Sequence, residues 1–97
     1  MTEYRLTPAA EHDLTGIWRY TARKWGVAQA NRYTDCLSAA FDELTHAPEM
    51  APTCDHIRPG YRRWHLERHV IYFRTTDYGI LFVRILHERM NAERHLN

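Results

Sequence analysis

The chain has few cysteines and no long apolar run. Its two cysteines, Cys36 and Cys54, do not stand in the close pairs typical of metal or redox sites, and no disulfide framework is evident. A reducing cytosol is therefore the expected compartment. No stretch approaches the roughly 20 apolar residues that span a bilayer, and no apolar signal segment begins the sequence. These absences predict a soluble protein that is neither exported nor held in a membrane.

Repeats and low-complexity tracts are also lacking, so the 97 residues are expected to form one domain spanning residues 1–97. A chain of this size buries roughly two thirds of the surface that its unfolded form exposes. The net charge is +1, but five basic and eight acidic side chains lie in residues 1–57, against eight and four in residues 58–97. All eight basic residues of the second part are arginines, which bind phosphate and carboxylate in a planar, bidentate way. The C-terminal part is therefore the better candidate for contact with an acidic partner.

The first half of the sequence has a helical pattern. Glu3–Leu6 alternates as a short strand, and Thr7 followed by Pro8 is typical of a helix start, with a capping hydroxyl and proline at the first position. Helices are predicted over Pro8–Trp25 and Val27–His46, separated by Gly26, so the short link indicates an antiparallel hairpin. The apolar stripes are Ala10, Leu14, Ile17, Trp18, Thr21 and Trp25 in the first helix, and Ala30, Tyr33, Leu37, Ala40, Phe41 and Leu44 in the second.

The second half has the period of strands. From Arg62 to Leu66 apolar and polar residues alternate, which predicts a half-exposed edge strand that carries Trp64. A second strand is predicted over Val70–Thr75, and a third, nearly continuous in apolar residues and therefore central, over Gly79–His87. The expected fold class is α+β, in the order β-α-α-β-β-β. A helical hairpin packs on one face of a mostly antiparallel sheet, in two layers.

Three collinear segments cover nearly the whole chain. They are LTPAAEHDLTGIWRYTARKWG (6–26), IRPGYRRWHLERHVIYFR (57–74) and GILFVRILHERMNAERHL (79–96). In content, order and spacing they resemble the ParE toxins of bacterial type II toxin–antitoxin modules, within the RelE/ParE superfamily. The resemblance implies a toxin that inhibits DNA gyrase by binding, with no catalytic residues and no cofactor.

The same resemblance implies a ParD-like antitoxin, encoded alongside, as the neutralising partner. Its flexible C-terminal part would wrap the toxin, and its N-terminal part would dimerise and bind the operator. DNA would then be contacted only through the antitoxin complex, with no membrane involved. Whether the toxin forms a homodimer or only a hetero-oligomer stays open.

Two other functions stay open, because the superfamily also contains ribosome-dependent mRNA endonucleases. RNA cleavage through the 2′-hydroxyl needs a proton acceptor, cations and a proton donor. Residues of the right type are Glu67, Arg84, His87 and Arg89. Against this function, the RelE-type enzymes use a lysine-rich surface and a C-terminal tyrosine, whereas this chain has only Lys24, and its last tyrosine is Tyr78. The third function is that of a non-toxic relative that only binds an antitoxin.

The basic ending Val83–Leu96 is the expected surface for the target. The candidates there are Arg84, His87, Arg89, Met90 and Arg94. Arg84 interrupts an apolar strand, and a buried charge is costly unless it is paired, so its side chain is expected to reach solvent or an acid such as Glu67 or Glu88. Such a cost is typical of functional sites, although a paired arginine that braces the tail explains it equally well. Met90 is expected to pack the tail against the sheet.

Partly exposed aromatic residues beside arginines are the expected surface for the antitoxin, since this composition is typical of interface hot spots. The candidates are Trp18, Tyr33, Arg62, Trp64 and Tyr72. Trp18 lies at the edge of its stripe and is expected to be partly wet, whereas Trp25 is expected in the core. The antitoxin could lay a helix into an apolar groove or add a strand to the sheet edge.

His65 and His69 have the spacing of a helical zinc pair. The turn predicted at Glu67-Arg68 places them on different strands, however, and further ligands would have to come from Cys54 or His56 in a loop. We therefore expect two surface histidines on neighbouring strands and no metal site.

Overall fold

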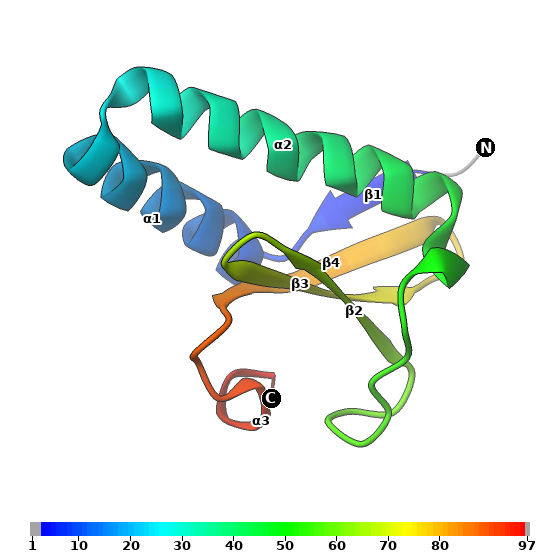
Figure 1. Ribbon diagram of the computed structural model, residues 1–97. Helices are drawn as coiled ribbons and strands as arrows, with labels where there is room; N and C mark the ends of the chain where they lie inside the picture. The colour runs from blue at the N-terminus through cyan, green and yellow to red at the C-terminus, as the bar shows by residue number, and fades with distance from the viewer. Residues whose placement is uncertain (1–2, 97) are drawn as a thin grey trace.

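The computed structural model describes residues 3–96, and the two long helices lie together on one face of a four-stranded sheet (Figure 1). The elements are β1 (Glu3–Leu6), α1 (Pro8–Trp25), α2 (Val27–His46), the 3₁₀ turn η1 (Pro48–Met50), β2 (Tyr61–Leu66), β3 (His69–Thr75), β4 (Gly79–His87) and α3 (Ala92–His95). The predicted α+β class, the β-α-α-β-β-β order and the bounds of both long helices are confirmed. The short helix α3 was not predicted. No helix within the described residues is long and apolar enough to cross a membrane.

The helical hairpin begins and ends as the capping residues indicate. The Thr7 hydroxyl accepts a hydrogen bond from the Ala10 amide at 3.0 Å, and Pro8 occupies the first turn of α1. Gly26 ends α1 with a φ of 97°, a conformation that glycine adopts at little cost, and its amide donates to the Ala22 carbonyl. Because only this glycine separates α1 from α2, the two helices run antiparallel along the sheet (Figure 1).

The sheet has the strand order β1-β4-β3-β2. β1 pairs with β4 in parallel, and the other pairs are antiparallel, so the mostly antiparallel sheet, the central position of β4 and the edge position of β2 are confirmed. A shift in register lies between Tyr72 and Phe73, since Phe73 pairs with Phe82 but Tyr72 pairs with Arg84. This bulge keeps both Phe82 and Ile85 on the face that packs against the helices.

The main core lies between the helices and the sheet. Its largest fully buried side chains include Phe41 from α2, Phe73 from β3 and Phe82 from β4. The prediction that Trp25 belongs to this core is wrong, because its side chain is 67% exposed. Trp25 is the last residue of α1, at the hairpin turn that projects past the end of the sheet (Figure 1). The apolar stripe of α1 therefore continues beyond the sheet that would bury it.

A second, smaller core covers the opposite face of the sheet. Cys54, Tyr72, Leu86, Ala92 and Leu96 are buried together there, beneath the C-terminal tail (residues 88–96) and the loop that precedes β2. Figure 1 shows α3 folded back on the side of the sheet away from the helices. The predicted arrangement of two layers is thus incomplete, since the tail adds a partial third layer.

Candidate functional site

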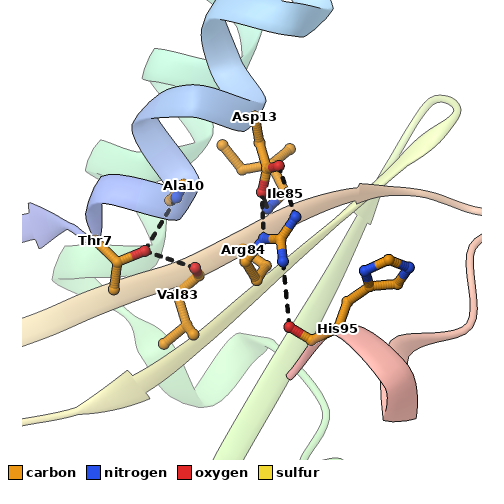
Figure 2. A network of polar contacts seen from close by, with 7 residues as sticks. All are labelled: Thr7, Ala10, Asp13, Val83, Arg84, Ile85 and His95. Atoms are coloured by element: carbon orange, nitrogen blue, oxygen red, sulfur yellow. Dashed lines mark hydrogen bonds and ion pairs between the residues drawn. The ribbon is translucent and has the colours of Figure 1, made fainter. Parts of the chain in front are cut away.

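Arg84 is the centre of a clamp that joins three parts of the chain (Figure 2). Its Nε donates to Asp13 Oδ2 at 2.7 Å and its Nη2 donates to Asp13 Oδ1 at 2.9 Å, which makes a bidentate ion pair with α1. Its Nη1 donates to the His95 carbonyl in the tail at 3.2 Å. The side chains of Arg84 and Asp13 are only 21% and 12% exposed. The hydrogen bonds and charge of Asp13 raise the pKa of Arg84, although burial opposes this.

The prediction that Glu67 or Glu88 pairs with Arg84 is wrong. Glu88 instead lies 3.0 Å from His65 Nε2, and Asp13, which sequence reasoning did not connect with Arg84, supplies the carboxylate. The alternative of a paired arginine that braces the tail is confirmed by the bond to His95. The only sequence signal for this pair was an aspartate in the second turn of α1 and one arginine in an apolar strand.

Thr7 and Asp13 also cover the edge of β4 beyond the end of β1 (Figure 2). β1 stops at Leu6, so among residues 3–96 the backbone of β4 beyond Phe82 has no strand neighbour on this side. The Thr7 hydroxyl donates to the Val83 carbonyl at 2.7 Å, and the Ile85 amide donates to Asp13 Oδ2 at 3.0 Å. Side chains thus replace the missing strand, and the Asp13 carboxylate accepts three hydrogen bonds from β4.

The tail is held by residues other than the expected one. Leu96 and Ala92 are buried in the smaller core, and Arg58 Nη1 donates to the Leu96 carbonyl at 2.8 Å. The prediction that Met90 packs the tail against the sheet is wrong, since Met90 is 40% exposed. It lies in a turn where its amide donates to the His87 carbonyl, before the chain bends back over the sheet.

The five residues expected to contact a target differ in their exposure. Arg84 is engaged in the clamp, whereas Arg89 and Arg94 are exposed. His87 and Met90 border a groove between the helical hairpin and the ends of β3 and β4, which we call the helix groove. The role of these five residues in target binding stays a prediction.

The helix groove has a volume of about 1050 Å³ and contains a chain of polar rings. The Tyr33 hydroxyl lies 2.6 Å from His69 Nδ1, which ties α2 to β3, and the His69 ring packs edge-on against His87 at 5.5 Å between centroids. Burial, together with the His87 charge, lowers the pKa of His69 from 6.5 to about 4. His69 is therefore neutral near pH 7.

His65 is exposed, as expected, but His69 is not a surface residue, because it is partly buried against Tyr33. The two histidines lie on different strands, as the predicted turn required. No cluster of three or more metal-ligating side chains is found within residues 3–96.

The five antitoxin candidates lie on different parts of the molecule. Trp18 is partly buried and its Nε1 donates to Asn31 on α2 at 2.9 Å, which confirms its position at the stripe edge. Tyr33 lines the helix groove, and Arg62 Nη1 donates to the Ala51 carbonyl at 2.6 Å. Tyr72 is only 5% exposed because the tail covers it.

Trp64, the remaining antitoxin candidate, borders a second groove. It packs against the main core and also lines this groove of about 620 Å³ between β2, β3 and the tail, which we call the tail groove. Its other lining residues include Ile57, Arg63, Val70, Tyr72 and Ala92. The groove is thus lined by both apolar and polar side chains.

Beside the tail groove, the outer edge of β2 is only half covered. The Cys54 amide donates to the Tyr61 carbonyl and the Arg63 amide donates to the Pro52 carbonyl, so residues 52–54 cover the first part of the strand. Within the described residues, Trp64–Leu66 has no strand neighbour on this outer side. An open edge next to a groove is a geometry that accepts an added strand or an extended segment.

Comparison with known proteins gives consistent matches over nearly the whole chain. The family model for the ParE toxin of type II toxin–antitoxin systems (parDE) matches residues 4–92. Toxin ParE1 of Mycobacterium tuberculosis is 41% identical over 96 residues, which cover 98% of each chain. Toxin ParE1 of Caulobacter vibrioides is 38% identical over 96 residues, which cover 99% of each.

Among solved structures, one described as the chromosomal ParDE TA system from P. aeruginosa superimposes with a TM-score of 0.79. The match covers 90% of this chain and 96% of that chain. The sequence identity is 21%, so this likeness concerns the fold.

Proposed function

Because the chain belongs to the ParE toxin family of type II toxin–antitoxin systems, we propose that it is a cytoplasmic toxin that inhibits DNA gyrase by binding. The observation that carries the proposal is the family match over residues 4–92 together with 41% identity over 98% of a ParE1 toxin. The exposed tail arginines and the two grooves are compatible with a protein that acts through contact surfaces.

Supercoiling of relaxed plasmid by purified gyrase, with the full chain added, tests this proposal. Inhibition at micromolar toxin, with growth arrest when the chain is expressed without an antitoxin, is the expected result. Intact supercoiling together with undisturbed growth contradicts it and favours the non-toxic relative. Arg74→Ala should inhibit gyrase as strongly as the parent chain, because Arg74 is an exposed arginine of β3 outside the clamp and outside both grooves.

A ribosome-dependent ribonuclease is the alternative that the same preparation tests. Of the four residues suited to RNA cleavage, Glu67 and His87 line the helix groove, but Arg84 is bonded to Asp13 and Arg89 does not line this groove. The two cations expected for that chemistry, Arg84 and Arg89, are therefore not assembled around Glu67 and His87. Cleavage of ribosome-bound mRNA by the purified chain, without inhibition of gyrase, decides for the ribonuclease.

We further propose that a ParD-like antitoxin neutralises the toxin by covering the tail groove and the open edge of β2. The apolar side chains that line the groove, such as Ile57 and Val70, can accept the apolar side of an antitoxin helix, and the outer edge at Trp64–Leu66 can accept an extended segment. Hydrogen exchange of the toxin with and without its antitoxin is the test. Added protection at residues 64–66 is expected, whereas protection confined to α1 and α2 contradicts this placement.

A further inference from the structure

The turn of the helical hairpin lies in a stretch without acidic side chains. Residues 14–34 contain no aspartate or glutamate, and the four basic side chains there are all exposed: Arg19, Arg23, Lys24 and Arg32. Within residues 3–96, the guanidinium groups of Arg19 and Arg23 have no hydrogen-bond or ion-pair partner. Like charges one helical turn apart destabilise a helix by a few tenths of a kcal/mol. Such a cost without a local compensation is typical of a binding surface.

The dipole of α1 explains only part of this charge. Arg23 and Lys24 are in the last turn of α1, where a cation is favourable. Arg19 lies a full turn earlier. Arg32, whose Nη2 donates to Gln29 Oε1 at 2.6 Å, lies in the N-terminal half of α2, where the dipole does not favour a cation. The dipole therefore does not explain the charge at Arg19 or at Arg32.

Two exposed aromatic side chains, Tyr20 and Trp25, lie beside these basic residues. Tyr20 is 57% exposed and Trp25 is 67% exposed. Lys24 Nζ lies 5.7 Å from the centroid of the Tyr20 ring and 6.0 Å from that of the Trp25 ring. We call Arg19, Tyr20, Arg23, Lys24, Trp25 and Arg32 the basic–aromatic surface. It combines accessible rings with positive charge at one end of the molecule.

This surface continues into the helix groove. Tyr20, Lys24, Trp25 and Arg32 line one side of the groove, and Arg68 lines the other. Two carboxylates also line it, but that of Asp13 is neutralised by Arg84, so Glu67 is left as the acidic group without such a pairing. The groove is therefore a positively charged concavity with aromatic rings at one end.

From this arrangement we propose that the basic–aromatic surface binds single-stranded nucleic acid. Phosphates would contact the arginines and Lys24, and bases would stack on Trp25 and Tyr20, which is the combination that proteins use for single strands without sequence preference. An acidic peptide would use the cations but gains little from the rings. The proposal is independent of gyrase inhibition. It departs from the expectation that DNA is contacted only through the antitoxin complex, because the toxin itself would bind nucleic acid.

Fluorescence anisotropy with labelled oligothymidylate and oligouridylate of about 16 nucleotides tests the proposal on the full chain. Binding is expected at low salt. The logarithm of the association constant should fall with the logarithm of salt concentration, by about 0.7 for each phosphate contacted. The double variant Arg19→Gln/Arg23→Gln should lower that slope by about 1.4. Trp25→Ala should weaken binding roughly tenfold without changing the slope, since stacking carries no charge.

Arg5→Gln/Arg74→Gln is the matched control, because both arginines are exposed and both pair with Leu81 at the other end of the sheet. It removes the same charge and should leave the slope and the effect of Trp25 unchanged. Equal weakening by the control, or no binding of either oligonucleotide at low salt, overturns the proposal. So does polyglutamate or an anionic phospholipid vesicle that binds as tightly as the oligonucleotides and depends equally on Trp25.

Discussion

Arg84 on β4 and Asp13 on α1 form a bidentate ion pair that also fixes the C-terminal tail (Figure 2). The two residues are 71 positions apart in the sequence. Because Asp13 Oδ2 also accepts the Ile85 amide and Arg84 Nη1 donates to the His95 carbonyl, three segments depend on this pair: α1, β4 and α3. The pair is thus a polar link between the helical layer and the tail.

Breaking this pair should destabilise the fold. Arg84→Ala leaves a mostly buried carboxylate without its cation, and Asp13→Ala leaves a mostly buried guanidinium and the Ile85 amide without their acceptor. Loss of one partner of such a pair costs about 3 kcal/mol. Urea unfolding should show this loss for each variant, whereas Arg74→Ala, on the surface of β3, should stay within about 0.5 kcal/mol of the parent. A change below about 1 kcal/mol in both clamp variants contradicts the structural role.

The same two variants distinguish a direct contact of Arg84 with gyrase from an indirect one. If Arg84 acts by holding the tail, Asp13→Ala and Arg84→Ala should reduce inhibition of supercoiling to the same extent, because both release His95 and α3. If the guanidinium itself touches gyrase, only Arg84→Ala should abolish inhibition. We expect equal reduction, since the Arg84 side chain is only 21% exposed and its Nε, Nη1 and Nη2 all donate to Asp13 or His95. Supercoiling assays at temperatures where both variants are folded give the measurement.

The helical hairpin and the central position of β4 could be predicted because their signals are local. Thr7 and Pro8 mark a helix start by hydrogen bonds within four residues, and Gly26 marks the end in the same way. The continuous apolar run of β4 indicated a central strand because both of its faces are covered. Such signals need no knowledge of the rest of the fold.

The clamp, the tail and the exposure of Trp25 could not be predicted, because each depends on what lies across space. A charged residue in a strand shows that a partner is needed, but it does not show which of many carboxylates is within reach of Arg84. The helical stripe shows which side of α1 is apolar, but it does not show where the sheet beneath it ends, so Trp25 was misplaced. Met90 was expected to pack the tail against the sheet because a methionine is large and apolar. The bend at residues 88–91 instead brings Leu96 into the smaller core.

Protonation of His69 should lower stability in acid. Its folded pKa is about 4, below the ordinary value of 6.5, because burial disfavours the charged ring and His87 lies beside it. Above about pH 6.5 the ring is neutral in both states and its contribution is fully present. As the pH falls from there toward 4, the unfolded chain binds the proton first, so the free energy of unfolding should fall by at most about 3 kcal/mol. Glu88 and Asp13 oppose the shift, and the nearby Tyr33 hydroxyl has a raised pKa and stays neutral.

Urea unfolding between about pH 7.5 and pH 4.5 measures this effect. His69→Phe should remove the part of the pH dependence that His69 causes. His65→Phe is the matched control, because His65 is exposed on the neighbouring strand and should leave most of the slope in place. The same pH dependence in His69→Phe and in the parent contradicts the assignment.

The tail should detach when Leu96 is shortened, because Leu96 is the buried side chain at its end. Leu96 is 3% exposed, and it packs in the smaller core with Tyr72 and Leu86. Leu96→Ala should cost about 2–4 kcal/mol in tail docking. Local opening then becomes cheaper than global unfolding, so the loss should appear first as faster hydrogen exchange in residues 88–95. Met90→Ala is the control, since Met90 is 40% exposed and should leave that exchange unchanged. If Met90→Ala loosens the tail and Leu96→Ala does not, the tail is held at the turn and not by the smaller core.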